Sequence, residues 1–161
     1  MNEPASVLDR LCQLGLRAGY RVLRVWWRVR RPVVHGAWVA VWCGDRLLVV
    51  RNSYRADLTL PSGGLKRGES PRRAAARELA EEVGLVVSPE QLHLAGEFAL
   101  DYEGKHDHAH FFELEVDALP EIRIDRREVV AAAFSSVREL DGQPLVPHAR
   151  AYLRQRAAST E

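Results

Sequence analysis

The chain has 161 residues, a length that suits a single domain with a sizeable core. Its composition, 47% hydrophobic and 28% charged, is ordinary for a globular protein and excludes a disordered or fibrous chain. The formal net charge is only +1, which excludes nucleic-acid binding through an overall basic charge. Two cysteines do not make a disulfide framework or a zinc site. No signal peptide and no uncharged stretch of about 18 residues is evident, so the expected compartment is the cytoplasm.

Residues 5–31 are expected to form one long amphipathic helix. An arginine stripe lies within about 80° of the helical wheel and borders a broad apolar face; it comprises Arg10, Arg17, Arg21, Arg24, Arg28 and Arg31. This pattern resembles helices that lie in a membrane interface. Packing against the rest of the chain and pairing with a second copy as a homodimer are alternatives, because amphipathicity alone does not identify the partner. Nucleic acid is not an expected partner, since no platform of stacking aromatic side chains accompanies the stripe. Peripheral contact with the inner face of the membrane is therefore an alternative to a purely cytoplasmic location.

A β-hairpin is expected directly after Pro32, which ends the helix. Val33–Trp42 is rich in β-branched and aromatic residues, and residues 47–51 form a second apolar run. Residues 43–46 between them supply turn chemistry. A polar loop is expected over residues 52–59.

Residues 71–83 are expected to form a helix of about three and a half turns. Ser70 is a suitable N-cap, and Pro71 suits the first helical position, where no backbone donor is needed. Three successive alanines favour the helix, and Gly84 can close it.

Three carboxylates lie close together on this helix. Glu78, Glu81 and Glu82 fall within about 100° of arc, and the opposite side is apolar. Converging carboxylate oxygens suit a divalent cation, most naturally Mg²⁺, with Mn²⁺ as the alternative. A solvated acidic face is the other interpretation of this spacing.

The rest of the chain is expected to alternate strands with a final helix. Strands are expected at residues 86–88, 92–100 and 108–116, with a charged loop at 101–107 and another apolar segment at 128–134. Residues 148–157 are expected to form the last helix.

The stretch from residue 63 to residue 85 resembles a known family. It matches every fixed position of the Nudix box, G-x5-E-x7-R-E-U-x-E-E-x-G-U, in which U is a bulky aliphatic residue. The matching residues are Gly63, Glu69, Arg77, Glu78, Leu79, Glu81, Glu82, Gly84 and Leu85. Just upstream, residues 60–64 are similar to the family's Leu-Pro-Gly-Gly-Gly, with Ser62 in place of one glycine. The chain is therefore identified as a member of the Nudix hydrolases.

The resemblance implies a fold in the α/β (α+β) class. The expected architecture is a Nudix-type α/β/α sandwich around a mixed β-sheet, with an extra N-terminal amphipathic helix. Residues 1–32 form that helix in this interpretation, and residues 33–158 form the hydrolase domain.

The resemblance also implies Mg²⁺-dependent hydrolysis of a diphosphate (pyrophosphate) linkage. The implied metal site comprises Gly63, Glu78, Glu81 and Glu82. Either Glu78 or a carboxylate outside the box acts as general base, and Glu128 is preferred there over Glu97, Asp101 and Glu103. Arg77 and Glu69 are expected to orient the carboxylate cluster rather than to contact substrate. Arg77 is counted among the catalytic residues because it positions these carboxylates.

The expected substrate is a small-molecule nucleoside diphosphate derivative, such as a dinucleoside polyphosphate or a nucleoside triphosphate. Arg51 and Arg55 precede the box and are candidates to bind substrate phosphate. Tyr102 resembles a tyrosine of dinucleoside polyphosphate hydrolases. Two alternatives remain open, namely membrane-associated hydrolysis of a lipid-linked or prenyl diphosphate and a non-catalytic binding module with the same fold.

Overall fold

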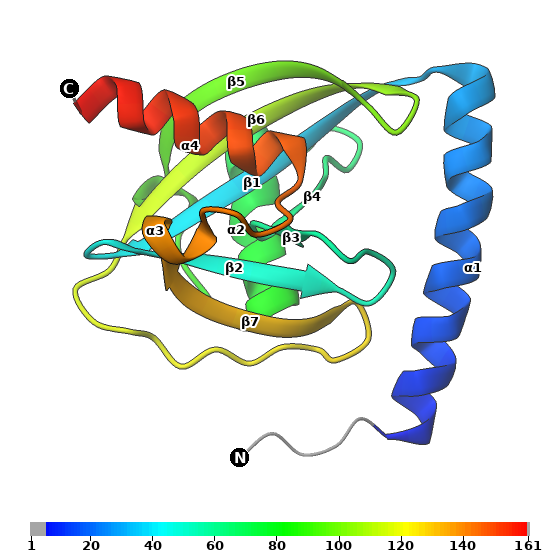
Figure 1. Cartoon of the computed structure of the whole chain (residues 1–161), viewed down its shortest axis with the longest axis horizontal. Helices are drawn as coiled ribbons and strands as arrows, with labels where there is room; N and C mark the ends of the chain where they lie inside the picture. The colour runs from blue at the N-terminus through cyan, green and yellow to red at the C-terminus, as the bar shows by residue number, and fades with distance from the viewer. Residues whose placement is uncertain (1–5, 161) are drawn as a thin grey trace.

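The computed structural model describes residues 6–160, and Figure 1 shows how their helices and strands are arranged. The elements in chain order are α1 (Val7–Arg30), β1 (Val33–Cys43), β2 (Arg46–Asn52), β3 (Leu58–Thr59), β4 (Ser62–Gly64), α2 (Pro71–Val83), η1 (Pro89–Gln91), β5 (His93–Tyr102), β6 (Lys105–Glu115), β7 (Val129–Ser136), α3 (Val137–Leu140) and α4 (Pro147–Thr160).

The strands form one mixed sheet. Its main order is β3-β2-β1-β6-β5, with β4 paired to β1 and β7 paired to β2. β1 and β6 run parallel, whereas β1 and β2 form the expected antiparallel hairpin. Because β1 pairs with β2, β4 and β6, it lies at the centre of the sheet.

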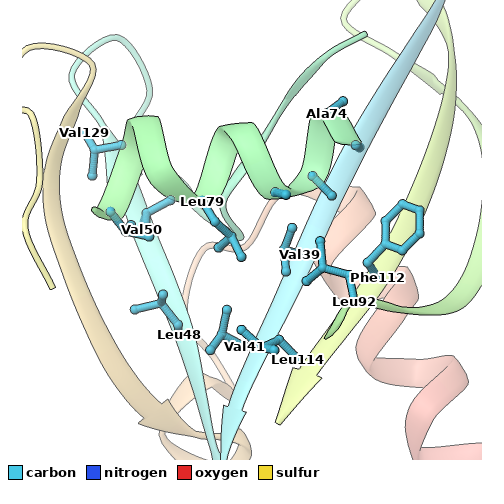
Figure 2. Packing of buried hydrophobic residues seen from close by; sticks show 14 residues of the cluster. Val39, Val41, Leu48, Val50, Ala74, Leu79, Leu92, Phe112, Leu114 and Val129 are labelled. Atoms are coloured by element: carbon cyan, nitrogen blue, oxygen red, sulfur yellow. The ribbon is translucent and has the colours of Figure 1, made fainter. Parts of the chain in front are cut away.

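Helices cover both faces of this sheet, because side chains on successive strand residues point to opposite faces. Val39 and Val41 of β1 pack with Leu79 of α2 in one buried cluster, shown in Figure 2. Trp38, Ala40 and Trp42 alternate with these residues along β1 and pack with residues of α4 in a second cluster. The result is a helix–sheet–helix sandwich around a mixed sheet, which confirms the predicted fold class.

α2 forms where the sequence predicted a helix. The Ser70 side chain accepts a hydrogen bond from the backbone N–H of Arg73 at 3.4 Å, and Gly84 adopts the left-handed conformation that ends the helix. Local capping and alanine propensity are therefore sufficient to define this element.

α1 lies outside the sandwich, along one end of it (Figure 1). A capping box between Ser6 and Asp9 begins the helix, and Arg31 in the left-handed conformation ends it before Pro32. None of its residues is buried. Within residues 6–160, the helices all lack either the length or the apolarity needed to cross a membrane.

Two predicted elements differ from the structure. Residues 86–88 do not form a strand, because this segment packs Val87 against the core without pairing to the sheet, and Val86 is exposed. The charged stretch 101–107 is not a loop. It is the end of a β5–β6 hairpin that turns at Glu103 and Gly104, both with positive φ, and the strand pairing continues up to Tyr102 and Lys105.

Candidate active site

The α2 carboxylates do not share one solvated face. Glu78 and Glu82 are buried, with 9% and 5% of their surface exposed, whereas Glu81 is exposed. The backbone N–H of Ser62 in β4 donates to Glu82 Oε2 at 3.0 Å. β4 pairs with β1 and so holds residues 60–64, here called the Nudix turn, against α2. Two carboxylates are thereby enclosed between a helix and a strand.

Burial disfavours the charged form of these carboxylates. It raises the pKa of Glu82 well above its usual range, and the repulsion of Glu78 and Glu128 adds to this although the Ser62 N–H opposes it. Burial also raises the pKa of Glu78, against the opposing effect of Arg77. Arg77 thus compensates part of the charge at Glu78, whereas at Glu82 the neighbouring carboxylates add to the effect of burial.

Arg77 ties the cluster to the turn. Its Nε and Nη2 donate to the two carboxylate oxygens of Glu69, both at 2.9 Å, and Nη2 also donates to the carbonyl of Gly64 at 3.0 Å. Its Nη1 donates to Glu78 and, at 3.1 Å, to Glu81. The guanidinium holds the pKa of Glu69 down at about 2. Glu69 and Arg77 thus have the geometry of orienting residues, and their assignment to that role stays a prediction.

Glu128 lies beside the box. Tyr54 donates its hydroxyl to Glu128 Oε1 at 2.9 Å, and the carboxylate is near enough to Glu78 and Glu82 to raise the pKa of both. Asp125 accepts from the backbone N–H groups of Glu128 and Val129 at 3.1 and 3.0 Å, which fixes the start of β7.

The other acids considered outside the box lie elsewhere. Glu97 and Asp101 are exposed on β5 and pair with histidines of β6. Glu103 pairs with Arg24 and Arg55. Among these four acids, the structure brings only Glu128 to the α2 cluster.

Gly63 has a steric reason to be glycine. A Cβ at this position would overlap the carboxylate of Glu78. The absence of a side chain lets the buried carboxylate lie directly against the backbone of the turn.

The residues of the cluster fit a divalent cation. Carboxylate oxygens are the ligands that Mg²⁺ and Mn²⁺ prefer, and a bound cation offsets the repulsion among buried carboxylates. Within the described part of the chain, no three acidic, histidine or cysteine side chains already converge as a ligand set. Arg77 instead lies among Glu69, Glu78 and Glu81. The metal set of Gly63, Glu78, Glu81 and Glu82 stays a prediction.

A cavity of about 320 Å³ begins at the Nudix turn. Ser62, Gly63 and Gly64 of β4 line it on the side of the α2 cluster. Its lining continues past Tyr54 and Arg55 to Asp107 of β6 and His148 of α4. A small ligand in this cavity would have one end beside the buried carboxylates.

Of the three predicted substrate-binding residues, two line the cavity and one does not. Arg55 and Tyr102 line the cavity, and the Arg55 guanidinium lies 5.6 Å from the centre of the Tyr102 ring. Arg51 is exposed on β2 and is absent from the lining. The assignment of all three to substrate binding stays a prediction.

Sequence reasoning missed much of the cavity wall. Tyr20, Leu23 and Trp27 of α1 line it, as do Lys105 and His148. Their positions in the sequence carry no motif, because only the docking of α1 and α4 on the sandwich brings them together. The one available signal was the interval of seven residues between Tyr20 and Trp27, which places two aromatic side chains on the same face of a helix.

Comparison with known proteins agrees with this architecture. The NUDIX domain model matches residues 33–156. An RNA pyrophosphohydrolase of Rhizobium meliloti (strain 1021) is 46% identical over 48 residues, which are 28% of this chain. The chain spans 29% of the length of this relative.

Two solved structures show the same fold. A MutT NUDIX hydrolase from Burkholderia pseudomallei has a TM-score of 0.65 at 24% identity, covering 76% of this chain and 97% of its own. A C. elegans Ap4A hydrolase binary complex has a TM-score of 0.66 at 19% identity, covering 79% of this chain and 97% of its own.

Proposed function

Because this chain belongs to the NUDIX domain family, we propose that it is a Mg²⁺-dependent hydrolase of a diphosphate linkage in a nucleoside diphosphate derivative. The observation that carries the proposal is the enclosure of Glu78 against Gly63 and of Glu82 against Ser62, two residues of the turn that lines a cavity of about 320 Å³. An enclosed carboxylate pair is costly to keep without a cation, whereas it is useful for binding one.

In this proposal Glu78, Glu81, Glu82 and the turn at Gly63 would hold Mg²⁺. The bound cation would supply neutralisation of the diphosphate oxygens and activation of water. Arg77 and Glu69 orient these groups through the hydrogen bonds between α2 and the turn. Glu128, held by the Tyr54 hydroxyl beside Glu78 and Glu82, is the carboxylate outside the box that is available to take the proton of the attacking water.

A nucleotide is the preferred substrate class for two reasons. The relatives reported above include an RNA pyrophosphohydrolase and an Ap4A hydrolase, both named for nucleotide substrates. The cavity beside the Nudix turn is also lined by aromatic side chains, including Tyr54 and Tyr102, that suit an aromatic base.

The first experiment is metal-dependent product release from a panel of diphosphates. The panel holds nucleoside triphosphates, dinucleoside polyphosphates, ADP-ribose, nucleotide sugars and prenyl diphosphates, each with and without Mg²⁺. We expect Glu82→Gln to lower kcat by at least about 100-fold, because metal ligation supplies several kcal/mol of transition-state stabilisation. Glu90→Gln, on the exposed η1 turn, is the matched control and is expected to keep full activity. A folded wild-type protein that releases product from no member of the panel contradicts the proposal and favours the non-catalytic binding module.

A second candidate function concerns the outward face of α1. We propose that this face binds an anionic membrane surface, which places the hydrolase beside lipid-linked substrates. The face is formed by apolar residues that remain exposed, including Leu11 at 60%, Val22 at 71%, Val25 at 63%, Trp26 at 48% and Val29 at 76%. Exposed arginines flank it, namely Arg10, Arg21, Arg28 and Arg30.

The charges on α1 favour lipid over a second copy of the chain. The acid of α1, Asp9, is paired with Arg127 and capped by Ser6, so it does not oppose the arginines. Two copies that met through this face would bring two arginine-rich helices together without carboxylates between them. Anionic headgroups attract such arginines, while the apolar side chains enter the acyl boundary.

Vesicle co-sedimentation of the full chain tests this second proposal. We expect binding to vesicles that contain phosphatidylserine, little binding to phosphatidylcholine alone, and a loss of about tenfold in affinity for Val22→Glu. Equal sedimentation of wild type and Val22→Glu would contradict membrane contact. A concentration-dependent dimer in light scattering without lipid, abolished by Val22→Glu, would favour the homodimer instead.

A further inference from the structure

The inward face of α1 forms part of the cavity that begins at the Nudix turn. Tyr20, Leu23 and Trp27 contribute this wall, opposite residues of β4. α1 ends at Arg30, and the match to the NUDIX domain begins at residue 33. The wall is therefore an addition to the family domain, and it lies beside the place where the proposed chemistry occurs.

Specific polar contacts hold this face in a defined position. Gln13 donates to the carbonyl of Arg126, and Arg17 Nε donates to the carbonyl of Ser53, both at 2.8 Å. Farther along the helix, Tyr20 donates its hydroxyl to Glu103 and accepts from Arg55 Nη2 at 2.5 Å. These contacts span two turns of α1 and meet three separate segments of the sandwich, so they fix the rotation of the helix about its axis.

The cations in the cavity wall are already paired. Arg55 lies 3.3 Å from Glu103, and Lys105 Nζ lies 2.9 Å from Asp107 Oδ2. Lys105 Nζ also lies 4.6 Å from the centre of the Trp27 ring. Since each of these two cations has a carboxylate partner, this part of the cavity favours an uncharged group over a further phosphate.

The remaining lining includes several aromatic side chains. Tyr20 packs against Tyr54 with ring centres 4.6 Å apart, and Trp27 meets Tyr20 edge to face at 6.2 Å. Trp38 lies on another side of the cavity, stacked on His148. Ring surfaces of this kind favour a flat, uncharged ligand that they can contact by stacking or by their edges.

We propose that the inward face of α1 is a substrate-specificity wall that binds the nucleobase of a nucleotide whose diphosphate lies at the Nudix turn. Trp27 and Leu23 contact the base, and Tyr20 is held in place by Arg55 and Glu103 to complete the wall. This inference rests on the proposed hydrolase function, because it assigns the diphosphate to the carboxylate cluster.

Adjacent tryptophans provide the test. Trp27 lines the cavity, whereas Trp26 is on the outward face and does not line it. The substrates are a nucleoside triphosphate and inorganic triphosphate, which share a phosphate chain and differ in the nucleoside. We expect Trp27→Ala to raise KM for the nucleoside triphosphate by about tenfold, with kcat within about twofold of wild type, because stacking of a base contributes roughly 1–3 kcal/mol. We expect no change with inorganic triphosphate, and no change for Trp26→Ala with either substrate.

A conservative variant separates base contact from helix positioning. Trp27→Phe keeps an aromatic ring at the wall and is expected to recover most of the affinity for the nucleoside triphosphate. An equal KM for Trp27→Ala, Trp26→Ala and wild type overturns the inference. A KM that rises equally for both triphosphates also overturns it, since the effect then lies in the phosphate site.

A binding measurement distinguishes failure of this inference from failure of the proposed function. Calorimetric titration with a non-hydrolysable nucleoside triphosphate analogue uses the Glu82→Gln protein, with and without Trp27→Ala. Weaker binding in the double variant supports the wall even if no substrate is hydrolysed. Equal affinity of the two proteins, or no binding to either, overturns it even if hydrolysis by the wild type is established.

Discussion

The guanidinium of Arg77 donates to the carboxylates of Glu69, Glu78 and Glu81 and to the carbonyl of Gly64. A lysine has no planar fork and could not make this set of contacts. The side chain thus links the helix that carries the acids to the turn that covers them. The requirement for arginine follows from this geometry, without any contact to substrate.

His148 is the second residue whose surroundings decide its chemistry. Its side chain is fully buried between Trp38 and Tyr102, and neither ring nitrogen has a hydrogen-bond partner. Burial lowers its pKa from 6.5 to about 4, although Asp107 at 3.5 Å opposes the shift. His148 is therefore neutral at physiological pH.

This pKa predicts a loss of stability in acid. Between pH 6.5 and about pH 4 the unfolded chain binds a proton at His148 and the native chain does not, so the free energy of unfolding falls as the pH falls. Lowering the pH from about 7.5 to about 5 is expected to reduce the free energy of unfolding of the wild type by about 2 kcal/mol through this residue. Urea unfolding at both pH values is the measurement, with His148→Gln as the comparison because it cannot titrate. A pH dependence of the same size in both proteins would exclude His148 as its source.

At this scale the sequence predicted candidate site residues that lie within one continuous segment. Helical spacing indicated Glu78 and Glu82, and the resemblance to the Nudix box added Glu69 and Arg77. A turn and a helix bring these residues together locally. Burial of Glu78 and Glu82 was not evident, since it depends on β4 lying over α2. Tyr20 and His148 meet only through long-range packing, so no local pattern could place them in one cavity.

At the scale of elements, the β5–β6 turn is one of the segments of the sandwich that α1 contacts. Gly104 has φ +86°, and a Cβ built there would lie 2.8 Å from the Cα of Arg28. Glycine is required for both the backbone conformation and the close approach of the helix.

Gly104→Ala is therefore expected to displace α1. The left-handed conformation should cost about 1–2 kcal/mol and the contact with Arg28 should force the helix outward. Amide hydrogen exchange is expected to accelerate in α1 as well as in the hairpin. Gly44→Ala is the matched control, because Gly44 has φ +60° and open space around its Cβ position. Exchange in α1 that increases equally in both variants would show that the Gly104 contact does not hold the helix.

The prediction of elements was accurate where local signals agree. Capping residues, alanines and a closing glycine specified α2, and continuous apolar runs rich in β-branched residues specified β1 and β2. The segment 86–88 has the composition of a strand but no neighbouring strand to pair with. The stretch 101–107 has the charges of a loop, yet they lie on a hairpin whose side chains form ion pairs such as Lys105–Asp107. Composition does not reveal these pairings.

Across the whole molecule, α1 and the sandwich are expected to be separable for folding. Neither buried core cluster includes a residue of α1, and the contacts of the helix are polar or aromatic. A protein that begins at residue 33 should therefore retain a cooperative thermal transition, with a decrease of about 2 kcal/mol or less in the free energy of unfolding. Circular dichroism and urea unfolding measure this. A non-cooperative transition would contradict the predicted division at residues 32 and 33.

Trp26 and Trp27 are consecutive in the chain, but they lie on different sides of α1. A substitution at one has no direct means of altering what the other contacts. If both proposals hold, single substitutions within one turn of helix can change membrane attachment without changing substrate preference, or the reverse. The two faces of this helix are then free to vary independently of each other.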